Sequence, residues 1–453
     1  MAKEKSPREI AFEVLKRIEH EGAYANLAVN QAVKGAVTKL DRAFITEIVY
    51  GTVRRRLTLQ WHLEHYLSKP WKKLDPDVRL ILLQGAYQLI YMNKVPASAA
   101  CNEMVNLTKK LRYRSAAGFV NGVLRNVARG KKNLKWPDKS LDPIEYIAVV
   151  HSHPRWLVKR WIENFGVEET EKLCTYNNQP SPVTARVNTL KTDYDGLSTA
   201  LKSESVQVLS SRMIPEALAI VSGPPLDKLR AFKEGLFTLQ DESSMLPASV
   251  LAPAPGTMVI DGCAAPGGKT THLAELMENR GRILACDVHN HKLKLIEANK
   301  NRLGISIVTE ELLDARELGE KYAGQADFLL LDVPCSGLGV LSRRADARWR
   351  KLPGDIVKMA SLQWEIITGA CRALKPGGIM VYSTCTITKE ENQWLIDKFV
   401  SEFPEFETED ITNLLPFTIK TEDVEDARLG RLQLLPQRHG VDGFFVARLR
   451  RKR

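Results

Sequence analysis

Apolar residues recur at helical spacing through the first 130 positions. Ser6 and Pro7 fit a helix N-cap followed by a first-turn proline, and the apolar positions 10, 14, 15 and 18 then share one helical face. The same period returns at 57–67, 77–92, 99–111 and 116–128. Because strand-like alternation is scarce, the pattern predicts an all-α domain over residues 1–135.

The pattern changes after a linker at 130–137 that is rich in glycine, proline and lysine. Beyond it, two helical stretches come before three short alternating runs. These runs lie near 182–188, 206–209 and 218–221. Residues 140–235 are therefore predicted to form a small α+β domain.

From 236 to 453, nearly continuous apolar runs alternate with helical stretches. The runs lie at 257–260, 282–286, 305–308, 327–331, 378–382 and 443–449. Apolar strands separated by helices are typical of a parallel sheet that is covered on both faces. The sequence therefore predicts a C-terminal α/β domain with a Rossmann-like, mostly parallel sheet.

Basic residues are concentrated in the N-terminal domain. Residues 1–140 carry 26 lysines and arginines against 12 acidic residues, a net charge of +14, whereas the remainder has a net charge of −3. This asymmetry indicates either a domain that binds a polyanion or a solvated basic surface. Without a membrane-length apolar run or the apolar core of a signal peptide, we expect a cytoplasmic, monomeric protein with no membrane partner.

A strand, a turn of small residues and a helix follow one another at 258–276. Small side chains let a ligand approach the backbone, and the first N–H groups of a helix bind anions. A P-loop is excluded because its first glycine would fall at Cys263, and no G-x-G-x-x-G motif is present. The candidate cofactor turn consists of Cys263, Ala264, Ala265, Pro266, Gly267, Gly268 and Lys269.

Acidic residues follow the next predicted strands. Asp287 ends the second strand, 19 residues after Gly268, where a carboxylate accepts hydrogen bonds from a ribose diol. Asp314 lies beyond the third strand, within reach of an adenine. A ligand with a ribose, an adenine and a small anionic tail fits this edge best, and S-adenosylmethionine is such a ligand. The alternative is a structural turn with solvated acids.

Two of the seven cysteines, Cys335 and Cys385, follow adjacent strands at this same edge. A thiolate that adds to carbon 6 of a pyrimidine makes carbon 5 nucleophilic toward a methyl sulfonium, and a base then removes the carbon 5 proton. Asp332 is placed to hold the polar edge of such a base. Spacing alone leaves open which cysteine attacks. Because the cysteines are scattered and no CxxC pair occurs, we expect no disulfide framework and no metal.

Several sequence blocks resemble those of a known family. DGCAAPGGKT at 261–270, DVPCSG at 332–337 and STCT at 383–386 resemble the signature blocks of RNA cytosine-5 methyltransferases. FTLQDESS at 237–244 and DGFFVA at 442–447 resemble the opening and closing segments of their catalytic domain. The N-terminal blocks at 24–30, 47–54 and 118–125 resemble a NusB-like RNA-binding domain, and ARVNTLK at 185–191 links the middle region, less specifically, to the same family.

This resemblance implies a function and a role for each matched residue. The chain would methylate carbon 5 of one cytosine in small-subunit (16S) ribosomal RNA, with S-adenosylmethionine as donor and with RNA bound by residues 1–135 and 140–235. Residues 236–453 would be the catalytic domain. Cys385 would be the nucleophile and Cys335 would assist product release. Asp287 would hold the ribose, Asp314 the adenine, and Asp332 would lie beside cofactor and target base. Many relatives carry a bulkier residue at the position of Gly262, and this difference leaves the cofactor assignment intact.

Two other classes of protein compete with this reading. A non-catalytic RNA-binding factor can be built on a NusB-like domain, but it would be expected to lose Cys385 or the Pro-Gly-Gly turn. A P-loop-like ATPase is already disfavoured by Cys263.

Overall fold

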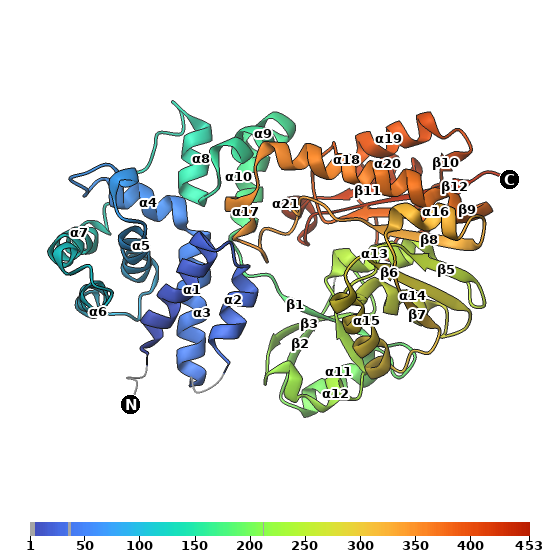
Figure 1. Cartoon of the computed structure of the whole chain (residues 1–453), viewed down its shortest axis with the longest axis horizontal. Coiled ribbons are helices and arrows are strands. Elements are labelled where there is room, and N and C mark those ends of the chain that lie inside the picture. Colours follow the sequence, from blue (N-terminus) through green and yellow to red (C-terminus); the bar gives the residue numbers. More distant parts are fainter. Residues whose placement is uncertain (1–4, 35–37, 212) are drawn as a thin grey trace. The chain divides into compact units, whose positions relative to one another are not determined.

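The computed structural model describes residues 5–34, 38–211 and 213–453, so the predicted domains at 1–135 and 140–235 are each described with small gaps. The chain folds into two compact units (Figure 1). The first unit contains residues 1–179 and 341–351, and the second contains residues 180–340 and 352–453. None of the helices within these described ranges is long and apolar enough to cross a membrane.

The first unit is entirely helical, as the 3.6-residue period predicts. Ser6 caps the first helix in a capping box with Glu9, and Pro7 occupies its first turn. Along the chain the helices are α1 (Pro7–His20), α2 (Ala25–Ala32), α3 (Lys39–Arg54), α4 (Arg56–Glu64), η1 (Trp71–Lys73), α5 (Pro76–Tyr91), α6 (Ala97–Lys110), η2 (Arg114–Ala116), α7 (Ala117–Gly130), α8 (Pro143–His151), α9 (Arg155–Phe165), α10 (Val167–Tyr176) and α17 (Ala347–Arg350). Helix α5 is buried over most of its circumference, so it forms the centre of the N-terminal helical core.

Segment 341–351 belongs to the first unit although it lies between two elements of the second. Trp349 Nε1 donates to the carbonyl of Val53 at 2.8 Å. The fully buried Arg348 donates to the carbonyls of Ser152 and Asn177 at 3.1 and 3.0 Å. The segment is therefore fixed among the helices by specific side-chain contacts.

The second unit begins with a small antiparallel sheet in the order β2-β3-β1-β4. Its elements are β1 (Val183–Val187), α11 (Tyr194–Ser203), β2 (Gln207–Ser210), β3 (Ala217–Ser222), η3 (Leu226–Lys228), α12 (Arg230–Lys233) and β4 (Phe237–Leu239). The three alternating runs of the sequence become β1, β2 and β3. Strand β4 lies beyond residue 235, in the FTLQ block, and pairs with β1.

The larger sheet has the order β10-β12-β9-β8-β5-β6-β7 in the described residues, with β11 added beside β12. Strands β5 to β9 run parallel, and β10 to β12 are antiparallel additions. Its elements are α13 (Glu242–Leu251), β5 (Met258–Asp261), α14 (Gly268–Leu276), β6 (Arg282–Asp287), α15 (Asn290–Leu303), β7 (Val308–Leu312), η4 (Ala315–Glu317), α16 (Leu318–Lys321), β8 (Ala326–Asp332), α18 (Pro353–Ala370), η5 (Cys371–Ala373), β9 (Leu374–Thr384), α19 (Gln393–Glu402), β10 (Phe406–Thr408), η6 (Thr412–Leu414), η7 (Thr421–Asp423), α20 (Val424–Arg428), β11 (Arg431–Leu434), α21 (Pro436–His439) and β12 (Phe444–Arg451). The predicted mostly parallel α/β domain is confirmed.

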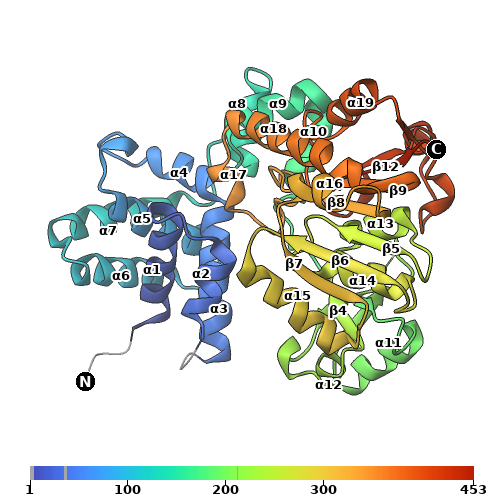
Figure 2. The ribbon, with the colours of Figure 1, turned by 45° about the vertical axis from the view of Figure 1, so that its right-hand side comes forward.

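Helices cover both faces of this sheet (Figure 2). Alternate side chains of each central strand point to opposite faces, so Val259 joins the core under α13, α14 and α15 while Ile260 joins the core under α16, α18 and α19. Strand order reverses at β5, because β6 and β7 follow on one side of it and β8 and β9 on the other. Ligands of such sheets bind at this switch point, outside the carboxyl ends of the strands.

The strand predicted at 305–308 is displaced in the structure. Ile305 donates its N–H to the carbonyl of Lys300 and completes the end of α15 after Gly304, which has a left-handed backbone. The strand itself, β7, begins at Val308. It lies at the edge of the sheet, where side chains are less buried, and it therefore accommodates two glutamates. An apolar residue that ends a helix was therefore mistaken for the start of a strand.

Candidate active site at the carboxyl edge of the sheet

The predicted cofactor turn connects β5 to α14 at the switch point. Gly267 has a φ of +100°, and a Cβ there would lie 3.2 Å from Ile296, so both the backbone angle and the space favour glycine. The N–H of Ala264 donates to the carbonyl of Cys286 at 2.8 Å and ties the turn to β6. Since α14 starts at Gly268, the first N–H groups of this helix have no acceptor within the helix. N–H groups of this kind can bind a small anion.

Asp261, the last residue of β5, lies directly below this turn and is completely buried. One carboxylate oxygen accepts a hydrogen bond from Thr270 Oγ1 at 2.7 Å, while the other has no hydrogen-bond partner among the described residues. Burial raises the pKa of Asp261 to about 7, with the Asp332 carboxylate adding to the rise and the Thr270 hydrogen bond opposing it. The unpartnered oxygen is a polar group that a bound ligand can satisfy.

Lys269 extends from the turn toward the end of β8. Its Nζ lies 2.7 Å from Asp332 Oδ2 and 5.4 Å from the centre of the Phe444 ring. Asp332 also accepts a hydrogen bond from Ser383 Oγ at 2.9 Å. Burial lowers the pKa of Lys269, but the charges of Asp332 and Cys385 raise it overall, so the side chain stays protonated. A cation is thus held at the strand ends where both cysteine motifs begin.

The two predicted cysteines meet at this edge. The Sγ atoms of Cys335 and Cys385 lie 3.2 Å apart, and the N–H of Gly339 donates to the carbonyl of Cys385 at 3.1 Å. The hydrogen bond with Cys385 and burial raise the pKa of Cys335 well above its usual value, and the charge of Glu391 adds to this shift. Cys335 therefore keeps its proton.

A fully buried glutamate organises the loop that carries Cys335. Glu391 accepts hydrogen bonds from the N–H of Ser336 at 2.8 Å, from Gln363 Nε2 at 2.9 Å and from the Ser336 hydroxyl. Thr388 Oγ1 adds a further bond at 2.7 Å. The carboxylate is held by neutral donors, and no cation pairs with it among the described residues. Sequence reasoning missed Glu391, because its contacts with Ser336 and Gln363 join segments that are far apart in the chain.

Asp287 and Asp314 lie where the strand pattern predicts them, but their surroundings differ. Asp287 ends β6 and accepts the N–H of His289 at 2.9 Å, next to Val288, which is 53 % exposed. Asp314 is paired with Arg316 Nη2 at 2.8 Å, which lowers the pKa of Asp314. Burial raises the pKa of Cys263 well above its usual value, and four surrounding carboxylates add to this effect: Asp261, Asp332, Asp287 and Asp314. All of these acids thus converge on the turn.

No group of three metal-binding side chains occurs within the residues that the structure describes. The cysteines of the site are free thiols. Its donors are carboxylates, one ammonium, two thiols and the backbone of a helix start, a set that suits a nucleoside with a small charged tail.

The fold and these motifs define a Rossmann-like methyltransferase preceded by a NusB domain. Residues 248–450 match the family model of the 16S rRNA methyltransferase RsmB/F, residues 5–129 match the NusB family, and residues 153–227 match the ferredoxin-like domain of RsmF/B-like methyltransferases. The chain is 38 % identical to the "Probable ribosomal RNA small subunit methyltransferase B" of Bacillus subtilis, over 99 % of this chain and 100 % of that protein. It is 32 % identical to the ribosomal RNA small subunit methyltransferase B of Proteus mirabilis, over 98 % of each chain.

Solved structures agree with this assignment. The crystal structure of PH0851 covers 98 % of this chain and 99 % of its own, with a TM-score of 0.80 and 29 % identity. NSun6 from Pyrococcus horikoshii, solved with SFG, covers 67 % of this chain and 100 % of its own, with a TM-score of 0.60 and 27 % identity. The chain belongs to the RsmB family of ribosomal RNA small-subunit methyltransferases.

Proposed function

We propose that the protein transfers a methyl group from S-adenosylmethionine to carbon 5 of a cytosine in small-subunit ribosomal RNA, through a covalent bond between the cytosine and Cys385. The observation that carries this proposal is the pair of cysteine sulfurs 3.2 Å apart at the carboxyl edge, beside the Lys269–Asp332 ion pair. A methyltransferase that acts on oxygen or on an exocyclic nitrogen has no use for a thiol at this place, because those atoms are nucleophilic without covalent activation.

The residues of the turn fit this methyl donor. The N–H groups at the start of α14 suit its carboxylate, and the unpartnered oxygen of Asp261 suits its ammonium group. Asp287 suits the ribose diol, and the exposed side chain of Val288 offers an apolar surface to the adenine. The carboxylate of Asp314 is paired with Arg316, so a hydrogen bond from the adenine edge would be a second contact of the same carboxylate. When bound, the donor would supply an electrophilic methyl group, whose bond to the sulfonium sulfur breaks and leaves the donor as a neutral thioether.

The two cysteines take different roles in this proposal. The resemblance to RNA cytosine-5 methyltransferases assigns attack to Cys385 and product release to Cys335, and the two sulfurs lie 3.2 Å apart, so both can reach one base. The Cys385 thiolate adds to carbon 6, and carbon 5 then forms the new bond to the methyl group. A base removes the carbon 5 proton, the Cys385–carbon 6 bond breaks and the pyrimidine double bond returns. Cys335 assists this last step, and Asp332 holds the polar edge of the base.

Replacing each cysteine in turn tests the proposal. Cys385→Ala is expected to reduce methyl transfer to 16S ribosomal RNA by at least about a thousandfold, since the covalent route is lost, while S-adenosylmethionine still binds. Cys335→Ala is expected to accumulate an RNA–protein adduct that survives denaturing electrophoresis, because attack proceeds and release does not. The measurements are transfer of labelled methyl groups, calorimetric binding and gel mobility.

Cys371→Ala is the matched control, since Cys371 is a buried thiol at the end of α18, outside the turn and the two cysteine motifs. It is expected to behave like the parent protein. Turnover by the Cys385→Ala variant would contradict the nucleophile assignment, and absence of any adduct in Cys335→Ala would contradict the release assignment. Methylation at an atom other than carbon 5 would overturn the proposed chemistry.

A further inference from the structure

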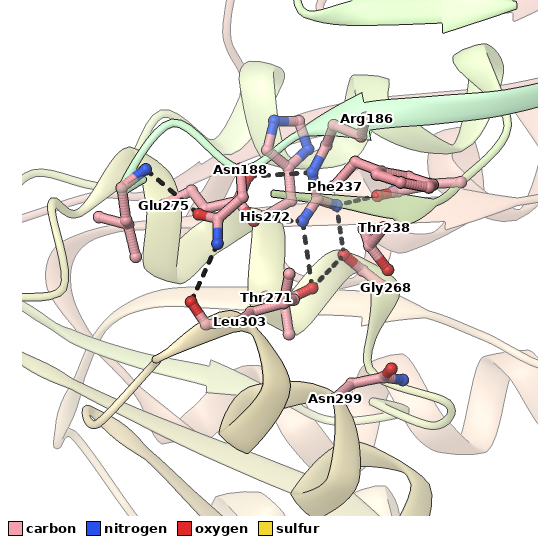
Figure 3. A network of polar contacts seen from close by, with 12 residues as sticks. Arg186, Asn188, Phe237, Thr238, Gly268, Thr271, His272, Glu275, Asn299 and Leu303 are labelled. Atoms are coloured by element: carbon pink, nitrogen blue, oxygen red, sulfur yellow. Dashed lines mark hydrogen bonds and ion pairs between the residues drawn. The ribbon is translucent and has the colours of Figure 1, made fainter. Parts of the chain in front are cut away.

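Arg186, in the middle of β1, is completely buried and uses all of its hydrogen-bond donors (Figure 3). Its Nε and Nη2 bind the two carboxylate oxygens of Glu275 at 3.0 and 2.7 Å. Nη2 also donates to Thr271 Oγ1 at 3.1 Å. Nη1 donates to the carbonyl of Gly268 at 2.7 Å and to the side chain of Gln240. The five N–H groups of a guanidinium are therefore all satisfied at one place.

The contact with Gly268 reaches the cofactor turn itself. A peptide unit is planar and trans, so fixing the carbonyl oxygen of Gly268 also fixes the direction of the Lys269 N–H in the same unit. In a helix this N–H points toward the N-terminal end, which is the end that faces the turn. A positive charge on the carbonyl oxygen also polarises the unit and makes the N–H a better donor to an anion.

Lys269 links the same peptide unit to the two catalytic motifs. Its side chain forms the ion pair with Asp332, and its positive charge interacts with Cys385. The orientation of this residue thus matters both for the anion site at the start of α14 and for the strand ends that carry the cysteines. Arg186 contacts this peptide unit from outside the turn, and Thr271 Oγ1 donates to the same carbonyl at 3.1 Å.

A second clamp joins the small sheet to the larger one without a contact to Gly268, although Arg302 reaches Asn299 at 3.5 Å and Asn299 donates to the carbonyl of Pro266 in the turn. Arg302, near the end of α15, donates to the carbonyls of Phe232 and Phe237 at 3.0 and 2.8 Å. Asn188 donates to the carbonyls of Gly235 and Leu303 at 2.8 and 2.9 Å (Figure 3). Packing between the two sheets is therefore secured at α15 as well as at α14, and only the Arg186 contacts reach Gly268.

We infer that Arg186 is a positioning residue for the methyl donor, which sets the Gly268–Lys269 peptide so that the start of α14 can receive the donor's carboxylate. The inference rests on the proposed function for the identity of the donor. It assigns a role in cofactor binding to a residue of the small sheet, in the ARVNTLK block, outside the cofactor turn and the two cysteine motifs.

Variants of the full-length chain test this inference by calorimetric titration with S-adenosylmethionine and by steady-state kinetics. Arg186→Met is expected to weaken donor binding by about tenfold or more, since one charge-assisted hydrogen bond to the turn is lost. The KM for the donor is expected to rise by a similar factor, while kcat at saturating donor changes far less. Arg186→Lys is expected to recover part of the affinity, because it restores the charge but not the fork geometry.

Two further variants distinguish an effect on the position of the cofactor turn from a general loss of protein stability. Asn188→Ala removes contacts of the other clamp that do not lead to the turn, and it is expected to leave the donor affinity within about twofold of the parent value. The double variant Arg186→Met, Glu275→Met replaces the buried ion pair by an apolar pair, which often restores the melting temperature. It is expected to melt near the parent protein and still to bind the donor weakly.

Three results would overturn the inference: unchanged donor affinity in Arg186→Met, recovery of affinity together with melting temperature in the double variant, or an equal loss in Asn188→Ala. These results differ from a failure of the proposed function. In that case the parent protein itself would not bind S-adenosylmethionine.

Discussion

Single residues at the carboxyl edge combine deep burial with unusual protonation. Asp261 is buried with one unpartnered oxygen, Cys335 holds its proton, and Lys269 stays charged through its pairing with Asp332. These groups lie within a few residues of the strand ends. Strongly shifted groups that gather in one place are typical of functional sites.

The protonation of Asp261 predicts how stability depends on pH. Its folded pKa of about 7 lies above the ordinary value of 3.8, so this carboxyl stabilises the folded chain below about pH 4 and loses that contribution as pH rises toward 7. The free energy of unfolding of the parent protein, compared with that of Asp261→Asn, is expected to fall by up to about 1.4 kcal/mol for each pH unit between pH 4 and pH 7. Above pH 7 this difference is expected to stay constant.

Chemical denaturation of both proteins at several pH values between 5 and 8 measures this difference. Asp327→Asn is a suitable control, because Asp327 is paired with Lys375 at 2.6 Å and has a lowered pKa. That variant should show no such loss toward pH 7. A difference between Asp261→Asn and the parent that is flat with pH would show that Asp261 is already ionised at pH 5.

The sequence predicts some of these residues for a simple reason. Parallel strands end at a common edge, so residues that follow successive strands, such as Asp287, Cys335 and Cys385, must converge. Glu391 and Arg186 were assigned no role, because their contacts join segments far apart in the chain and no local period reports them. The pairing of Asp314 with Arg316 was likewise missed, although only two positions separate them.

At the scale of elements, the helical period and the apolar strand runs predict the fold closely. The strands that differ are edge or short ones: β7 is shifted, and the sequence does not indicate β4, whose three residues gain their place by pairing with β1. One group of exposed basic residues in the helical unit lies around the turn from α6 to α7. Lys109 is exposed at the end of α6, Arg112 and Arg114 follow it, and Arg129 is exposed near the end of α7.

This basic turn is predicted to contact RNA phosphates. Replacing Arg112 and Arg114 by glutamate is expected to weaken binding of 16S ribosomal RNA and to reduce the slope of log affinity against log salt by about 1 to 2, because two phosphate contacts are lost. Arg280→Glu with Arg282→Glu makes the same change of charge at exposed positions where β6 starts. Equal effects of the two double variants would mean that net charge alone, and not this turn, determines binding.

At the scale of the whole molecule, the polypeptide chain crosses between the two units more than once. As far as the described residues extend, the chain passes from one unit to the other at 179–180, at 340–341 and at 351–352. The second passage follows Val340, five residues after Cys335. The loop that carries Cys335 therefore continues directly into segment 341–351. The continuous domain pattern of the sequence gave no indication of this.

Arg348 is predicted to be the main anchor of that segment. It is fully buried, its pKa is lowered to about 9 by burial, and no carboxylate pairs with it among the described residues. Arg348→Met leaves the carbonyls of Ser152 and Asn177 without their donor, and is expected to cost about 2–4 kcal/mol of stability in the helical unit.

Hydrogen exchange of segment 341–351 and denaturant unfolding measure this loss. Arg350→Met is the matched control, since Arg350 is only half-buried and pairs with Asp346 at 3.3 Å. Its cost is expected to be smaller, about 1 kcal/mol. Unchanged exchange in Arg348→Met would show that the segment is held by Trp349 and Asp346 instead.

Because segment 341–351 belongs to the helical unit, residues 1–179 alone are an incomplete version of that unit. A fragment that stops at residue 179 keeps the carbonyl groups of Val53, Ser152 and Asn177 but lacks the eleven residues 341–351, whose side chains bind to them. A version of the helical unit that is produced alone therefore needs residues 341–351 joined back to it through an added linker.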